Sequence, residues 1–553
     1  MVKLRDWAAG LLLFFATAAV IFWQGTHRVV LWDLSYVLDT AARIASGQMP
    51  YRDFPLVHTP GTFLVQAALM QLTGRVFLHS VIYISLIGGL SSVLAWRIAL
   101  RILGGARLPA LLVSLPLVVL GIYCILPQPS YDCDTIFWVL VALWAWQHIE
   151  APKAGFWRGI WVGIAIAMPL SFKQNIGLPF LAVAVIAALV VMTQRGWRTG
   201  QTRALRGLLC GVAATLIAAV LVLHFTAGIG NLLHWTITFA GQRRMPGLAA
   251  MFSVYADPQL LWTLPCIFVG GWLAGRSRQW LRVAGILLAA APFLWTLGEL
   301  ARSNDADDRA SALLALWPMI LIAATVVAVL RLIRARTSLD GAAFLPLLVL
   351  AAVQGTLMSQ QLWGSTYAIF PLLMLLAAGL LAAMPGPGWA RASIAGVFSV
   401  TLLVSGGLYI ASAERLSYAQ FPSGPPVRSG FGALAGMATP GPFVPDLDEL
   451  LAYAQAHIPA GDGLILLPGE DPFYFVTGRA PQFPVLLFDP STDPYSSAEA
   501  AAEARRRNIR WLVVKRRLQI TESPAPDGTA LEVTLERDFH IEAHLGGYDV
   551  YRR

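Results

Sequence analysis

The sequence predicts a polytopic α-helical membrane protein of about thirteen transmembrane helices, with its N-terminus inside and a small extracytoplasmic α/β domain at its C-terminal end. Hydrophobic residues make up 57% of the 553 residues, charged residues only 13%, and the mean hydropathy is +0.63. A water-soluble chain of this length needs more charge to cover its surface. Apolar runs recur from Leu11 to Ile410, and the composition becomes soluble-like after about Ala413.

Segments of about 17–25 apolar residues span a bilayer. We place the predicted spans at 7–25, 79–100, 108–126, 135–149, 158–172, 176–193, 207–226, 260–275, 283–299, 312–330, 342–359, 368–385 and 393–412. The first outer loop covers about 26–78. Its apolar run Thr62–Leu72 is too short for a span and indicates an interfacial or re-entrant segment.

The distribution of charge predicts the orientation. With the N-terminus inside, the outer loops hold roughly half as many basic residues as the inner loops, as the positive-inside rule requires. The net charge of +9 is thus explained by the membrane, and we exclude nucleic acid as a partner. The acids show the opposite bias. An odd number of spans then places the C-terminus outside.

We divide the chain into a transmembrane domain (1–412), a Pro- and Gly-rich linker (413–445) and an α/β domain (446–553). The α/β domain shows alternating helix and strand patterns. The expected elements are helices at Asp446–His457 and Ser496–Arg507 and strands at Gly463–Pro468, Ile509–Arg516 and the closing YDVYRR. No nucleophile elbow, phosphate loop or metal-ligand set is present there, so we expect a supporting role.

The first outer loop opens with a helical pattern that starts at Asp33. Apolar residues recur on one face, Gly47 supplies a stop, and Asp39 and Arg43 lie four residues apart on the opposite face. This pattern predicts an amphipathic helix on the outer membrane surface. Asp33 then occupies the N-cap position, and both a capping role and a catalytic role fit it.

Two further polar residues of this loop are candidates for acceptor or metal binding. Asp53, in PYRDF, has Arg52 and Lys173 as candidate partners. His58 precedes Pro60 and Gly61 at the return to the membrane, where an interfacial histidine is the alternative.

A second acidic cluster lies in the short outer loop SYDCDT. Two carboxylates beside a membrane are costly without partners, so Asp132 and Asp134 are candidate ligands for a divalent cation or for substrate hydroxyls. Capping of the fourth span is the alternative reading.

Isolated cations on the outer side suit a lipid phosphate. Lys173, in FKQNIG, lies between two apolar spans, and snorkelling to headgroups is its alternative role. Arg243 and Arg244 add anion-binding capacity in a later outer loop. Gln360, Gln361 and Tyr367 bring amide and aromatic groups that suit a sugar, although an interfacial aromatic belt also explains Tyr367.

Together these motifs resemble the GT-C integral-membrane glycosyltransferases, and most of all the family 39-like group of protein O-mannosyltransferases and the lipid A aminoarabinose transferase. The residues that carry the resemblance are Asp33, Ala42, Arg43, Gly47, Pro50, Tyr51, Arg52, Asp53, Phe54, Pro60 and Gly61. SYDCDT, FKQNIG and VTGRAP (476–481) add weaker support. Two departures stand out: Leu34 replaces the second acid found in many members, and HTPG replaces the Pro-Pro return of the aminoarabinose transferases.

The resemblance implies an inverting transfer of a sugar from a polyprenyl-phosphate carrier to a glycan, lipid or protein acceptor at the outer face of the cytoplasmic (inner) membrane. It implies that Asp33 acts as base or organises the acceptor, that Asp132 or Asp134 is the second acidic group, and that Lys173 contacts phosphate. A divalent metal ion is a candidate cofactor.

Two other functions stay open. A transporter or flippase of a lipid-linked glycan would place acids at mid-membrane depth, whereas these acids lie in loops. A non-catalytic subunit of glycan assembly would use its soluble tail to bind a partner.

Overall fold

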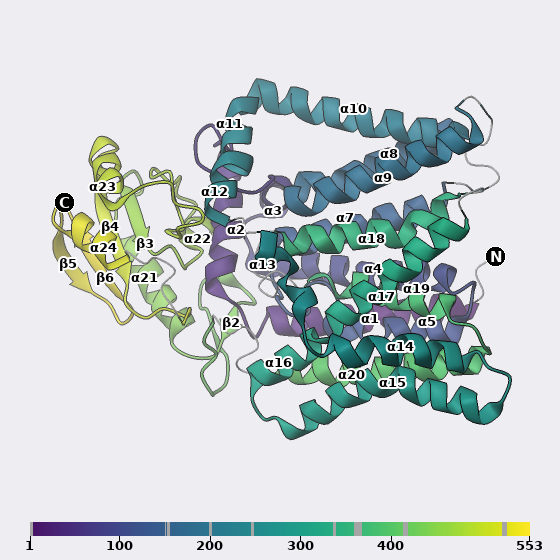
Figure 1. Ribbon diagram of the computed structural model, residues 1–553. Coiled ribbons are helices and arrows are strands. Elements are labelled where there is room, and N and C mark those ends of the chain that lie inside the picture. Colours follow the sequence, from purple (N-terminus) through teal and green to yellow (C-terminus); the bar gives the residue numbers. More distant parts are fainter. Residues whose placement is uncertain are drawn as a thin grey trace.

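The architecture comes from a computed structural model of the chain. It describes residues 4–149, 151, 155–197, 199, 202–244, 248–335, 339–358, 368–412, 419–521 and 528–553. Long helices run side by side in one part, and a small α/β domain lies at one end of them (Figure 1).

The long helices confirm a polytopic membrane protein. Within the described residues, seven are long and apolar enough to cross a membrane. They are α1 (Leu4–Gly25), α4 (Phe77–Ile102), α9 (Gln174–Arg195), α10 (Arg203–Thr226), α15 (Gln279–Arg302), α17 (Leu316–Arg334) and α20 (Gly388–Ala411). Shorter helices complete the bundle: α5 (Arg107–Ser114) with α6 (Leu117–Leu120), α7 (Tyr131–Trp146), α8 (Phe156–Phe172), α14 (Leu260–Ala274), α18 (Gly341–Leu357) and α19 (Phe370–Ala383).

Each of the thirteen predicted spans overlaps one of these helices. The third is broken between α5 and α6 at Pro116, which lacks the backbone N–H that a continuous helix needs. The short elements between the long helices are α11 (Ile229–Leu233), a π-helix (His234–Phe239), α12 (Ala240–Arg244), α13 (Leu248–Phe252), a 3-10 turn (Ser253–Ala256) and α16 (Ala306–Leu314).

The C-terminal domain contains a four-stranded sheet in the order β3-β4-β6-β5. Strands β3 (Gly463–Leu467) and β4 (Ile509–Lys515) are parallel, while β6 (Tyr548–Arg552) pairs antiparallel with both β4 and β5 (His540–His544). The other elements are a short antiparallel pair, β1 (Val427–Arg428) and β2 (Ala438–Thr439), a 3-10 turn (Gly432–Leu434), and the helices α21 (Phe443–His457), α22 (Phe473–Thr477), α23 (Ser497–Arg506) and α24 (Gly528–Glu536). The domain boundaries at 412 and 445 stay a prediction.

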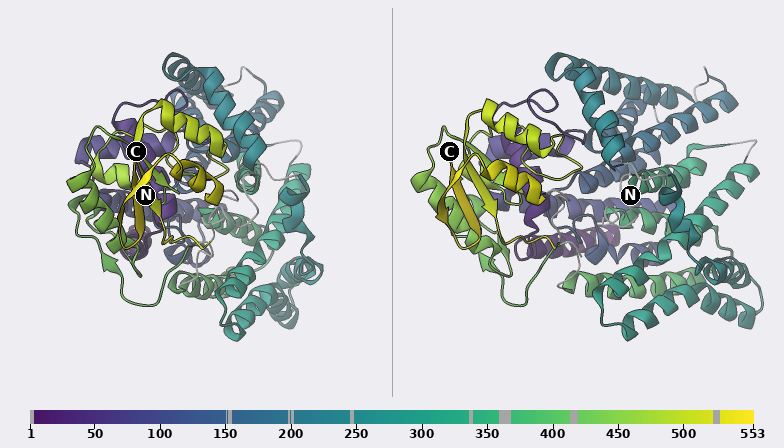
Figure 2. Two further views of the ribbon diagram at one scale, coloured as in Figure 1. Left: turned by 90° about the vertical axis from the view of Figure 1, so that its left-hand side faces the viewer. Right: turned by 60° about the vertical axis from the view of Figure 1, so that its left-hand side comes forward.

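The first loop contributes two helices, α2 (Leu31–Ala45) and α3 (Gly61–Thr73). Figure 1 shows α2 between the bundle and the C-terminal domain, and the N-terminus at the opposite end of the bundle. Figure 2 shows the C-terminal domain in front of the bundle in its left view and at one end of the bundle in its right view. Leu31, Leu34 and Leu38 of α2 belong to one hydrophobic cluster with Leu447 and Val513 of the C-terminal domain. The apolar face of α2 therefore packs against the C-terminal domain and not, as its amphipathic pattern suggests, against lipid.

Candidate functional site

Polar side chains from four separate segments meet at the end of the bundle that faces the C-terminal domain. We call Tyr36, His58, Tyr131, Asp132 and Lys173 the polar cluster. The hydroxyl of Tyr36 lies 3.2 Å from Nδ1 of His58, and the His58 ring stacks on Tyr131 at a centroid distance of 3.9 Å. The Nζ of Lys173 forms an ion pair with Asp132 and lies 5.0 Å from the centre of the Tyr131 ring.

The structure places Lys173 and Asp132 together in the interior. Both side chains are almost fully buried, with exposed fractions of 4% and 2%. Snorkelling of Lys173 to lipid headgroups is therefore excluded in this structure. Capping is excluded for Asp132 as well, because the N-cap of α7 is Ser130.

Asp134 is held by hydroxyl groups from three other segments. One carboxylate oxygen accepts from Thr62 at 2.6 Å, and the other accepts from Tyr83 at 2.7 Å and from Tyr123. Asp134 joins α3, α4, the segment before α7 and α7 itself. Its role in this structure is to fix these elements around the polar cluster.

Asp33 lies in the first turn of α2, and its side chain is half-buried. The N-cap residue of this helix is Val30, so the expected capping role of Asp33 is wrong. A carboxylate in the first turn is favoured by the positive end of the helix dipole. Tyr36 follows three residues later and therefore shares a face of α2 with Asp33. Tyr36 belongs to the polar cluster, so this face of α2 borders the cluster. Asp33 is the partly exposed carboxylate on the same face.

Asp39 and Arg43 do not form the solvated pair that their spacing predicts. Both are buried, at 4% and 2% exposure. Asp39 accepts the backbone N–H of Phe475 at 2.7 Å, and Arg43 donates to the carbonyl oxygens of Pro484 and Phe483 at 2.6 and 2.8 Å. The four-residue rule assumes a solvent-facing helix, whereas here the C-terminal domain covers these side chains.

Asp53 and His58 have different surroundings. Asp53 pairs with Arg52 at 2.8 Å and accepts the N–H of Met49 at 2.7 Å. The hydrogen bond from Arg52 lowers the pKa of Asp53 below its usual range. His58 is buried, and its carbonyl accepts the hydroxyl of Tyr51 at 2.7 Å. His58 thus belongs to the polar cluster, while Asp53 lies apart from it on the loop surface.

Of the remaining candidates, Arg243 is not brought to the polar cluster. Arg243 donates to the carbonyl of Pro490 at 3.1 Å and so contacts the C-terminal domain. Residues Gln360, Gln361 and Tyr367 and the side chain of Arg244 lie outside the described residues. In VTGRAP, Arg479 donates to three carbonyls at the end of α21, which is a structural role.

Tyr36 and Tyr123 were missed from the sequence, and Tyr51 was named only for the family resemblance. Tyr36 has a usable signal, its three-residue spacing from Asp33. Tyr51 and Tyr123 adopt positive φ angles of 68° and 65°, which are costly for a tyrosine and occur preferentially at functional sites. No sequence pattern indicates these angles. Among the described residues, no group of three His, Cys, Asp or Glu side chains is arranged to hold a metal ion.

No family model and no curated protein matches this chain. Among solved structures, the chain is similar to an oligosaccharyltransferase from Archaeoglobus fulgidus crystallised with zinc and sulfate. The TM-score is 0.51, the identity 12%, and the alignment covers 98% of this chain and 73% of that one.

ArnT from Cupriavidus metallidurans is also similar, in two states. The form bound to undecaprenyl phosphate has a TM-score of 0.46 at 14% identity, over 99% of this chain and 98% of that one. The apo form has a TM-score of 0.46 at 16% identity, over 98% and 97%. The likeness to the oligosaccharyltransferase shows that this chain shares the fold of that protein, which is the kind of fold that the resemblance in its first loop implied.

Proposed function

We propose that the protein is a membrane glycosyltransferase that moves a sugar from a polyprenyl-phosphate carrier to a glycan, lipid or protein acceptor. The observation that carries the proposal is the position of Asp33. This half-buried carboxylate lies on the face of α2 that contacts the polar cluster, in a fold shared with a solved oligosaccharyltransferase.

The reaction assigns a role to each group. Asp33 takes the proton of the acceptor hydroxyl, whose oxygen attacks the anomeric carbon as the bond from that carbon to the phosphate oxygen breaks. The carbon inverts, and polyprenyl phosphate leaves. The charge that develops on the phosphate needs a cation nearby, and Lys173, already fixed by Asp132, supplies it.

The proposal includes a location. The α/β domain and α2, the helix that carries Asp33, lie at the end of the bundle opposite the N-terminus (Figure 1). The basic residues favour the N-terminal end as the cytoplasmic one. We therefore assign the site to the outer face of the cytoplasmic membrane, where a polyprenyl carrier lies in the bilayer beside it.

The test uses the purified full-length protein with a panel of radiolabelled polyprenyl-phosphate sugars, with and without chelator. We expect release of polyprenyl phosphate from one donor. Asp33→Asn should lower the transfer rate by about 10²–10⁴-fold because the amide accepts no proton. The variant should still fold and insert into the membrane.

The matched control is Asp308→Asn, which makes the same exchange at an exposed aspartate of α16 and should leave the rate unchanged. Normal transfer by the Asp33→Asn variant would remove the role of Asp33. Release from no donor would overturn the transferase and favour transport of a lipid-linked glycan.

A further inference from the structure

The helix that carries Asp33 begins without a cap of its own. The first four N–H groups of any α-helix have no partner within the helix, and a side chain at the N-cap usually accepts one of them. The N-cap of α2 is Val30, which has no side-chain acceptor. Some other part of the molecule must therefore satisfy the start of α2.

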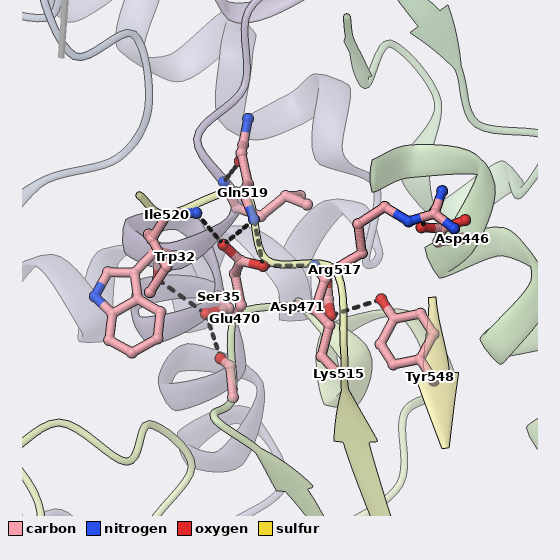
Figure 3. Close-up of polar contacts among 12 residues, drawn as sticks. Trp32, Ser35, Asp446, Glu470, Asp471, Lys515, Arg517, Gln519, Ile520 and Tyr548 are labelled. Carbon is pink, nitrogen blue, oxygen red and sulfur yellow. Dashed lines mark hydrogen bonds and ion pairs between the residues drawn. The ribbon is translucent and has the colours of Figure 1, made fainter. Parts of the chain in front are cut away.

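Gln519 of the C-terminal domain occupies this position (Figure 3). Its Oε1 accepts the N–H of Leu31 at 2.8 Å, and its Nε2 donates to the carbonyl of Val29 at 2.9 Å. The side chain of Gln519 is fully buried. One amide thus binds the backbone on both sides of the N-cap residue Val30, which lies three residues before Asp33.

Gln519 is itself fixed by a buried carboxylate. Glu470 accepts the backbone N–H groups of Gln519 and Ile520, each at 2.9 Å, and pairs with Nζ of Lys515 at 2.7 Å. Asp471 binds the same Nζ at 2.8 Å and the hydroxyl of Tyr548 at 2.7 Å. Glu470 and Asp471 follow β3 and Lys515 ends β4, so the group lies at the carboxyl ends of two parallel strands. In α/β domains this edge is where ligands bind, and here it holds α2.

The contacts with the C-terminal domain lie on one face of α2. Besides Leu31, Ser35 donates to the carbonyl of Gly469 at 2.8 Å, and Asp39 accepts from Phe475. These positions recur every fourth residue and so share a face, whereas Asp33 lies about 200° around the helix axis from Leu31. Fixing this face therefore sets the direction in which Asp33 points.

We propose that Gln519 is a positioning residue that caps α2 across the domain interface and orients Asp33 for the transfer reaction. The C-terminal domain is then a required part of the transfer site. This inference rests on the proposed function, and it adds a residue 486 positions away from Asp33 that touches no substrate.

The test is Gln519→Met in the full-length protein, which keeps the volume of the side chain and removes the hydrogen bonds of its amide to Leu31, Val29 and Thr439. We expect kcat to fall by about tenfold or more, since small misplacements of a reacting group are costly. The KM for the donor should be unchanged. Hydrogen exchange of peptides that cover residues 29–36 should become faster. Gln482→Met is the matched control, because among the described residues the side chain of Gln482 donates to Gly461 of its own domain, at 2.8 Å.

The exchange measurement separates this inference from the proposed function. If the unchanged protein transfers no sugar, the proposed function fails, and exchange alone then decides whether Gln519 caps α2. The inference would be overturned if Gln519→Met had the same hydrogen exchange and the same kcat as Gln482→Met. It would also be overturned if Gln519→Met lowered kcat and raised KM while its hydrogen exchange stayed unchanged. Should Gln519→Met not fold, Ser35→Ala removes one hydroxyl from the same interface. Faster exchange and lower kcat in that variant support the inference, and the absence of both overturns it.

Discussion

The buried ion pair between Lys173 and Asp132 makes both residues sensitive to single substitutions. Lys173→Met would leave the Asp132 carboxylate in the protein interior without its cation. Removing one partner of a buried pair costs about 3–5 kcal/mol, mostly because the remaining charge is left uncompensated. We expect a correspondingly lower unfolding midpoint for this variant in detergent or nanodiscs.

Two further variants show whether the cost comes from the lone charge. The double variant Lys173→Met with Asp132→Leu removes both charges and should recover much of the lost stability. Arg302→Met breaks an exposed pair with Glu299 and should have little effect. A midpoint for Lys173→Met equal to that of Arg302→Met would show that the ion pair contributes no stability.

The sequence indicates these charged residues as candidates but does not indicate their partners. A carboxylate or lysine beside an apolar span is conspicuous, so Asp132, Asp134 and Lys173 are selected by residue type and position alone. Their pairing depends on how α7 packs against α8 and α9, which no local pattern records. The same limit explains Asp39: its spacing from Arg43 is local, while the domain that buries both lies more than 400 positions away.

Helix α2 depends on the ionisation of Asp39, which accepts the N–H of Phe475 in α22. Burial raises the pKa of Asp39 well above its usual value of 3.8, although the N–H of Phe475 lowers it. An acid with a raised pKa binds its proton more tightly in the folded state. Its contribution to stability is therefore present at low pH and is lost as pH rises above 3.8 through the folded value.

Asp39→Asn keeps an acceptor oxygen and cannot ionise. We expect the unfolding midpoint of this variant to depend less on pH above 3.8 than that of the unchanged protein. Asp39→Ala leaves the N–H of Phe475 buried without a partner, at a cost of about 1–3 kcal/mol. Asp53→Asn is the control. Arg52 lowers the pKa of Asp53 below 3.8, so loss of this carboxylate should not alter the pH dependence of the unfolding midpoint above 3.8. A slope for Asp39→Asn equal to that of the unchanged protein would contradict the role of Asp39.

At the scale of the whole molecule, the sequence predicts the helices of the membrane part but not the interface between that part and the C-terminal domain. Apolar runs and strand patterns are local signals, so the thirteen spans and the strands β3, β4 and β6 were expected. Strand β5 was missed because its residues are mostly exposed and show no alternation of burial. The docking of α2 was missed because its apolar face fits a membrane surface and a protein core equally well.

The hydrophobic cluster around α2 predicts that this helix and the C-terminal domain unfold together. Leu38 is fully buried in that cluster, with residues of α21, β4 and β6. Leu38→Ala should cost about 2–5 kcal/mol, because it removes buried methyl groups and leaves a cavity. Hydrogen exchange should then speed up in β3 and α21 as well as in α2, since these elements share one core.

Leu64→Ala, at a position of α3 that is 48% exposed, is the control and should change neither the stability nor the hydrogen exchange of these elements. Faster exchange confined to α2 would show that the C-terminal domain is stable without this helix. The domain would then position α2 only through polar contacts, such as those of Gln519.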